Sequence, residues 1–364
     1  MTTARRGAPS VAAAMARPFD NFALIRLGLA LAVVVSHAFS VATGAPGEEP
    51  LVRSTGFSLG EHAVNGFFAV SGFLVTMSYE RRGPRDYAIA RLLRIVPGFV
   101  AATLAVALLL GPALTRLSAP EYFASPGPWR FVGATLTGFK STAALPGVFE
   151  ANPFRFAMGT VWTLKYEVLC YAGVLALGLA GLLRSRAFAL ALVAGLALAV
   201  AGLDLLAPDA GKGVQTALRL PLVFAAGGAL YLWREGVRLS GLALAGLLVA
   251  AVLLQDTFAY RAVLFLAEAY GVIWLALAPG LPHLALDPKA DLSYGTYLYG
   301  WPIQQSLVQL WPAASPLVLL GPAVALTLTV AALSWLLVEK PALGLKARLT
   351  GRRPMLAPVS PAVP

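Results

Sequence analysis

Residues 20–42 read DNFALIRLGLALAVVVSHAFSVA, a run in which almost every residue is apolar. At a rise of about 1.5 Å per residue, a helix of this length crosses a hydrocarbon core about 30 Å thick. The run therefore predicts a membrane-spanning helix, although it contains Arg26 and His37. Because the core of a signal peptide is shorter and excludes such residues, we interpret the run as an uncleaved first span.

The composition extends this interpretation to the whole chain. Of the 364 residues, 58% are hydrophobic and only 12% are charged, about half the roughly 25% of a soluble domain. The excess apolar surface must face lipid, which predicts an all-α, polytopic integral membrane protein. The net charge of +11 lies in small clusters between apolar segments, a distribution typical of topology signals and not of nucleic-acid binding. The single cysteine, Cys170, excludes an intramolecular disulfide.

Proline, glycine and charged residues divide the chain into about ten apolar segments, each long enough to span a membrane. We expect helices at 20–42, 59–79, 90–113, 158–183, 187–207, 216–234, 239–257, 260–280, 291–311 and 316–338. With an inner N-terminus, 18 Lys and Arg residues fall on the inner side and eight on the outer side, while Arg26 and Lys165 lie within spans. This bias predicts ten spans with both termini in the cytoplasm.

The domain organisation follows from the same segments. We expect one transmembrane domain over 1–345 and a disordered cytoplasmic tail over 346–364, which is rich in proline and arginine. The long segment at about 114–157 falls on the outer side and has room for short interfacial helices.

Arg26 and His37 are functional candidates, because an ionisable residue inside a span is costly unless it is paired or hydrated. They are eleven residues apart, which places them on one helix face about 16 Å apart. An arginine near the cytoplasmic mouth can hold a phosphorylated donor, and a histidine deeper in the membrane can remove a proton from an acceptor hydroxyl. The alternative is a structural arginine with a histidine that makes an interhelical hydrogen bond.

A second cationic pair, Arg91 and Arg94, starts the third helix with i, i+3 spacing, so both residues share a face. The alternative for this pair is ordinary anchoring at the cytoplasmic boundary. We prefer that alternative for the neighbouring arginines, which are Arg81, Arg82 and Arg85.

Glu167 is a third anomaly, in the stretch TVWTLKYEVLCY at 160–171. Its carboxylate requires a partner, which either Arg26 or a bound acceptor would supply. The aromatic residues of this stretch suit an interface belt or a wall that stacks on a sugar; they are Trp162, Tyr166 and Tyr171. The remaining histidines, His62 and His283, are weaker candidates, and the spacing of the histidines gives no metal-site signature.

In this order the elements resemble membrane acyltransferase family 3, integral-membrane O-acyltransferases that modify bacterial surface glycans and some secondary metabolites. The resemblance covers about 19–341. Its motifs are Arg26 followed by His37, GFFAVSGF at 66–73, RLLRIVP at 91–97, WTLKYE at 162–167, SYGTYLYGWP at 293–302 and EKP at 339–341. The chain departs from the family at Asn65, where members often have an acidic residue, and at Gly300, where many have histidine.

The resemblance implies a chemistry and a set of partners. The co-substrate would be acetyl-CoA or another acyl-CoA from the cytoplasm, with no permanently bound cofactor and no metal. The acceptor would be a surface saccharide or glycolipid, and the location the bacterial inner membrane. The resemblance assigns Arg26, Arg91 and Arg94 to donor binding or site architecture, and His37 to catalysis.

We add Glu167 as a second catalytic candidate, and either Glu167 or Tyr171 would position the imidazole or the acceptor. The expected acceptor-binding residues are Trp162, Tyr166, Tyr171, Ser71 and Tyr297. Whether His37 acts as a general base or carries the acyl group itself is open at this point. Two other functions also stay open, a transporter of a glycan or acyl donor and a non-catalytic membrane partner of an envelope complex.

Overall fold

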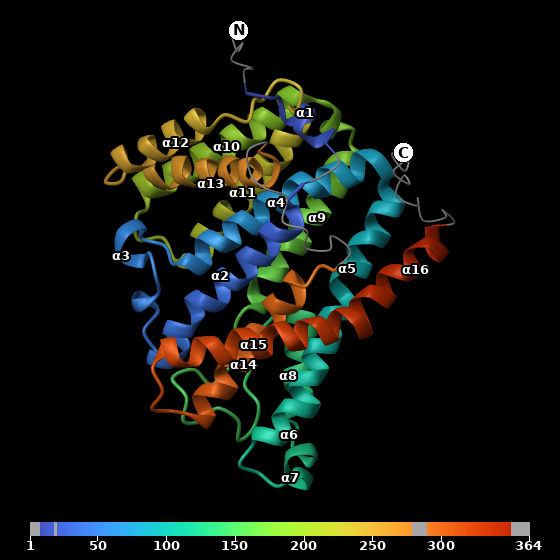
Figure 1. The fold of residues 1–364 in the computed structure, drawn as a ribbon, viewed down its shortest axis with the longest axis vertical. Coiled ribbons are helices and arrows are strands. Elements are labelled where there is room, and N and C mark those ends of the chain that lie inside the picture. The colour runs from blue at the N-terminus through green and yellow to red at the C-terminus, as the bar shows by residue number, and fades with distance from the viewer. Residues whose placement is uncertain (1–7, 18–19, 279–289, 351–364) are drawn as a thin grey trace, which may run out of the picture.

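The computed structural model describes residues 8–17, 20–278 and 290–350, which fold almost entirely as α-helices (Figure 1). A long helix overlaps each of the predicted spans. These helices are α2 Phe22–Thr43, α4 Leu59–Arg82, α5 Pro84–Ala105, α9 Leu164–Leu179, α10 Arg186–Leu206, α11 Lys212–Leu232, α12 Gly241–Leu253, α13 Tyr260–Leu277, α14 Ser293–Leu310 and α15 Pro316–Ser334. The prediction of an all-α, polytopic membrane protein is confirmed.

Six helices or continuous helical segments in the described part of the chain are long and apolar enough to cross a membrane. They cover Phe22–Thr43, Pro84–Leu114, Arg186–Leu206, Lys212–Leu232, Tyr260–Leu277 and Pro316–Lys346. The count of ten spans and the cytoplasmic location of both termini stay predictions.

Two of these segments continue through a π-helical turn. In the first, α5 passes through η2 (Val106–Leu110) into α6 (Gly111–Leu114), and in the second α15 passes through η5 (Trp335–Glu339) into α16 (Lys340–Thr350). Helix α16 thus reaches Thr350, which lies inside the segment predicted as a tail. The rest of that segment, 351–364, and the loop with His283 lie outside the described residues.

Helix α4 occupies the centre of the molecule and packs against α2, α11 and α13 (Figure 1). The backbones of α4 and α11 lie so close together that only glycine fits at two positions. A Cβ atom at Gly72 would overlap the carbonyl oxygen of Phe224, and a Cβ atom at Gly227 would overlap that of Ala69. Small residues permit such close packing of helices in a membrane. The pair of glycines therefore fixes α4 against α11, and the large cavity described below lies beside these two helices.

The predicted outer segment folds back onto the helices as an ordered cap. It contains α7 (Ala119–Ala124) and α8 (Gly127–Gly138), the latter packed against α5. Three polar side chains on one face of α14 hold the cap by donating to its carbonyl groups. Trp301 donates to Phe156 at 3.0 Å, Gln305 to Phe154 at 2.8 Å and Gln309 to Leu114 at 2.8 Å.

Candidate active site

Helix α2 presents its two ionisable residues to two different cavities. His37 lines a large cavity of about 960 Å³, and Arg26 lines a small one of about 50 Å³. Residues of opposite charge and aromatic residues line the large cavity, among them Glu49, Glu61, Trp162, Lys165, Tyr166, Asp204, Lys212, Arg219 and Arg261. The small cavity is lined by residues that include Ser71, Glu167, Ser293, Tyr294 and Tyr297.

The imidazole of His37 is paired with a carboxylate that the sequence did not single out. Its Nδ1 lies 3.2 Å from Oε1 of Glu49, and Glu49 also accepts a hydrogen bond from the hydroxyl of Ser36. Glu49 is buried, with 7% of its surface exposed, in the loop between α2 and α4 just after the short helix η1 (Pro46–Glu48). The ring of His37 also meets the ring of Trp301 edge to face, with 5.1 Å between centroids.

The electrostatics of this pair fix the charge of the glutamate. Burial alone would raise the pKa of Glu49, but hydrogen bonds and charge from His37, with hydrogen bonds from Ser36 and Ser40, lower that pKa to about 2. Glu49 is therefore ionised at neutral pH and accepts the Nδ1–H of His37, so the neutral form of the ring carries its lone pair on Nε2. Among the described residues, no side chain or backbone group hydrogen-bonds to Nε2. The arrangement suits a general base or a nucleophile.

Two of the predicted donor-binding arginines converge on one carboxylate. Arg26 Nη1 lies 2.5 Å and Arg94 Nη2 2.7 Å from Oδ2 of Asp291, just before α14. Arg94 Nη1 also lies 3.6 Å from Glu339, the last residue of the π-helical turn η5. The structure thus gives Arg26 a different partner from the expected Glu167. Two arginines and two carboxylates balance in charge and join α2, α5, α14 and η5.

Arg91 differs from the other two arginines, because it has no carboxylate partner in the described part of the chain. Its guanidinium lies over the ring of Tyr171, 5.6 Å from the centroid, and its Nε is buried without a hydrogen-bond partner. Tyr171 in turn donates to Glu167 at 2.5 Å. Glu167 therefore shares the small cavity with Arg26 but is held by Tyr171, while the contact to the imidazole belongs to Glu49.

The residues predicted to bind the acceptor divide between the two cavities. Trp162 and Tyr166 line the large cavity, with their rings nearly perpendicular and their centroids 6.1 Å apart. Ser71 and Tyr297 line the small cavity. Tyr171 lines neither of them.

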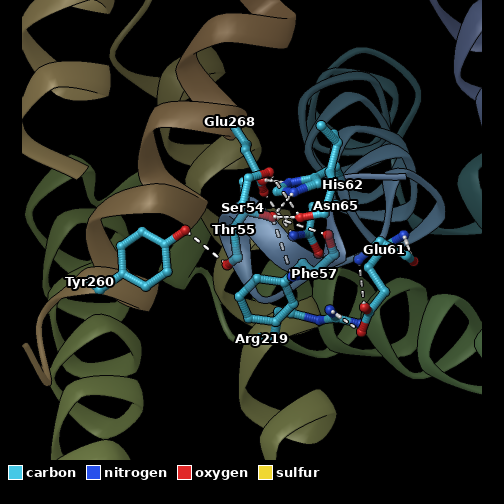
Figure 2. A network of polar contacts seen from close by, with 11 residues as sticks. Ser54, Thr55, Phe57, Glu61, His62, Asn65, Arg219, Tyr260 and Glu268 are labelled. Atoms are coloured by element: carbon cyan, nitrogen blue, oxygen red, sulfur yellow. Dashed lines mark hydrogen bonds and ion pairs between the residues drawn. The ribbon is translucent and has the colours of Figure 1, made fainter. Parts of the chain in front are cut away.

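A second histidine–carboxylate pair, formed by His62 and Glu268, lies in the polar network of Figure 2. His62 hydrogen-bonds through Nδ1 to Glu268, and its Nε2 lies 2.8 Å from the hydroxyl of Thr55. Asn65 donates to the other oxygen of Glu268 at 2.7 Å. This contact explains why the chain has asparagine at position 65 in place of an acidic residue. The amide of Asn65 donates to Glu268, whereas a carboxylate at this position would repel Glu268.

The departure at Gly300 has a steric reason. A Cβ atom at this position of α14 would lie 2.8 Å from the side chain of Val34 on α2. A histidine at 300 therefore requires a wider separation of these two helices than this chain has.

Comparison with known proteins assigns the chain to a family. Residues 19–338 match a family described as "Acyltransferase domain". The chain belongs to this acyltransferase family. It is 27% identical over 333 residues to an "O-acetyl transferase" of Shigella phage Sf6, a match that covers 88% of this chain and 94% of that protein. It is 30% identical over 365 residues to "Nodulation protein 10" of Rhizobium leguminosarum bv. viciae, which covers 92% and 96% respectively.

No solved structure matches the chain. The family assignment confirms the resemblance that the motifs predict, and the chain is a multi-pass membrane O-acyltransferase. An acyltransferase requires an acyl donor and an acceptor, so the assignment favours the transferase over the transporter and over a non-catalytic partner.

Proposed function

We propose that this enzyme transfers an acetyl group from cytoplasmic acetyl-CoA to a hydroxyl of a saccharide or glycolipid, in the bacterial inner membrane. The observation that carries the proposal is the pair His37–Glu49, in which His37 lines a cavity of about 960 Å³ and its Nε2 has no partner among the described residues. The name of the phage relative, an O-acetyl transferase, supports an acetyl group as the group transferred and a hydroxyl as its acceptor.

His37 acts as the general base in the proposed step. Its Nε2 removes the proton from the acceptor hydroxyl while the hydroxyl oxygen attacks the thioester carbonyl carbon. The carbon–sulfur bond then breaks, and the CoA thiolate leaves and takes the proton from the imidazolium. Glu49 stabilises the imidazolium and keeps the ring oriented, as a buried carboxylate does beside a catalytic histidine.

The acceptor occupies the large cavity, whose volume falls within the range of about 300–1,000 Å³ typical of ligand sites. Trp162 and Tyr166 form an aromatic wall on which a sugar ring stacks.

The donor approaches from the opposite end of α2, past Arg91 and the small cavity. Arg91 is the donor-binding candidate that is free to bind a phosphate, whereas Arg26 and Arg94 are paired with Asp291 and hold the helices together. The small cavity, at about 50 Å³, is narrower than a ligand site of roughly 300 Å³. Binding of the pantetheine arm therefore requires the surrounding helices to part.

The test uses detergent-purified enzyme, labelled acetyl-CoA and a panel of envelope saccharides. Wild-type enzyme is expected to label an acceptor, and His37→Gln to lose the activity, while the exposed-loop variant Glu48→Gln keeps it. Transfer by His37→Gln at the wild-type rate would refute the assignment of His37. Label that appears on the enzyme in the absence of acceptor, is released by hydroxylamine and is absent from His37→Gln would replace the general base by an acyl-histidine route.

A further inference from the structure

We propose that the acceptor is anionic and that the large cavity recognises its negative group through Lys165, Lys212 and the first turn of α11. This inference names the substrate class of the proposed function and rests on it. The inference is based on an excess of positive charge among the residues that line the large cavity beside His37.

Every carboxylate that lines the large cavity is already bound to a partner. Glu49 is bound by His37, and Glu61 lies 3.1 Å from Nη1 of Arg219. Asp204 accepts from Nε of Arg261 at 2.6 Å.

Lys165 and Lys212 also line this cavity, and neither has a carboxylate within ion-pair distance among the described residues. The ammonium of Lys165 lies over the ring of Tyr166, 4.9 Å from its centroid. The other acidic residues of the flanking loops, Glu48 and Asp209, do not line the cavity. Together with Arg219 and Arg261 these lysines make four cationic side chains in the lining against three carboxylates, so the net charge of the lining is positive.

The beginning of α11 adds to this positive potential. Its first residues, Lys212 and Gly213, line the cavity. No side chain caps the helix at Gly211, and its first turn contains no acidic residue. No described group accepts from the backbone N–H of Lys212 or Gly213, whereas that of Val214 donates to the carbonyl of Gly211 at 2.9 Å. Free N–H groups at a helix N-terminus favour anions.

A buried arginine supplies an independent sign of an unfilled interaction. Arg219 lies two turns further along α11 and lines the same cavity with a side chain that is only 5% exposed. Glu61 occupies its Nη1, as Figure 2 shows, but its buried Nε has no partner. Arg219 thus places a buried cation, with an Nε that no described group satisfies, in the wall of the cavity.

The geometry of the first turn of α11 is fixed rather than adaptable. Arg261 joins Asp204 of α10 to Gln215 of α11, to which it donates at 2.7 Å, and Gln215 donates to the carbonyl of Ala210 at 2.7 Å. The donors are therefore preorganised for an anion beside the aromatic wall of Trp162 and Tyr166. A carboxylate on a sugar ring and the diphosphate of a lipid-linked sugar share this chemistry.

The experiment measures binding to purified full-length enzyme by titration calorimetry without acetyl-CoA. One pair of probes is a glucuronic acid–glucose disaccharide and its carboxyl-reduced form. The other pair is a glucose linked to a short isoprenoid through a diphosphate and the same glucose linked as a simple glycoside. We expect the charged member of one pair to bind roughly tenfold more tightly, as a hydrogen bond to a charged group does, and the pair that discriminates identifies the source of the anion.

The variant Lys165→Gln/Lys212→Gln is expected to lose this preference, whereas Lys165→Arg/Lys212→Arg and the control Lys340→Gln, outside the cavity, keep it. Equal affinity for charged and neutral probes in both pairs, or a preference that survives in the Gln variant, would overturn the inference. Because binding is measured without a donor, a charge preference in an enzyme that transfers no acetyl group would refute only the proposed function.

Discussion

The described part of the chain contains two histidine–carboxylate pairs, and they differ in what the second ring nitrogen contacts. In each pair Nδ1 contacts a glutamate, Glu49 for His37 and Glu268 for His62. The Nε2 of His62 is taken by Thr55, whereas that of His37 has no partner in the described part of the chain and its ring lines the large cavity. A histidine–carboxylate pair is therefore a candidate base only where its other nitrogen is open to substrate.

The two pairs are also connected through one loop. Glu49 and Thr55 both belong to the segment between α2 and α4. Thr55 is held there by His62 and by Tyr260, which donates to its carbonyl at 2.9 Å (Figure 2). The pair His62–Glu268 thus helps to hold the loop that positions Glu49 beside His37.

The largest difference between the pairs is expected on removal of each imidazole. His37→Gln should lower kcat by about 10²–10⁴-fold, the usual contribution of a general base, and His62→Gln should lower it far less. Initial rates of label transfer at saturating acetyl-CoA measure both. If the two variants lost kcat equally and had equal thermal stability, His37 and His62 could not be assigned different roles.

Glu49→Gln should reduce kcat by roughly 10–100-fold, because a hydrogen bond to a charged group contributes about 1.5–3 kcal/mol. The amide keeps the shape of the side chain but removes the charge that stabilises the imidazolium. The neighbouring exposed Glu48→Gln serves as the matched control. A wild-type kcat for Glu49→Gln would show that His37 works without its carboxylate.

The lowered pKa of Glu49 also predicts a dependence of stability on acidity. The pKa falls from its ordinary value of 4.5 to about 2 in the folded protein, so the ionised group stabilises the fold above pH 4.5. This contribution is lost as the pH falls from 4.5 to about 2. Unfolding of the wild type, compared with Glu49→Gln across that interval, should converge at the acid end, and a constant difference would contradict the lowered pKa.

The smallest effect is expected where the two pairs meet. Thr55→Val removes the hydroxyl that contacts His62 and should lower kcat by roughly 2- to 10-fold, the equivalent of one neutral hydrogen bond of about 0.5–1.5 kcal/mol. Thr55→Ser keeps the hydroxyl and should restore the rate, with an unchanged KM for acetyl-CoA in both. A change confined to thermal stability would mean that the loop does not position Glu49.

The positions of the helices could be predicted from the sequence, because a long apolar run between charged or glycine-rich segments is a local signal. The ionisable residues of α2, α5 and α9 stood out for the same reason, since a charge within such a run is anomalous. Their partners did not. Asp291 meets Arg26 across 265 positions of the chain, and Glu268 meets His62 across 206, so only the packed structure brings them together.

Glu49 escaped prediction for a different reason. It lies only 12 positions from His37, but in a stretch of glycine, proline and two adjacent glutamates that is typical of an exposed turn. Burial of one of these two glutamates against α2 depends on how the loop folds back. A carboxylate close in sequence to the end of a membrane-spanning helix that contains a histidine is the signal that would have found Glu49.

The carboxylate shared by Arg26 and Arg94 has a consequence for the order in which the protein is made. The ribosome synthesises these arginines 265 and 197 positions before Asp291. Until the start of α14 emerges, both cations lack the partner that makes their place in a membrane affordable. A chain cut short before residue 291, which lacks about the last fifth of the sequence, is therefore left with two arginines that this carboxylate cannot neutralise.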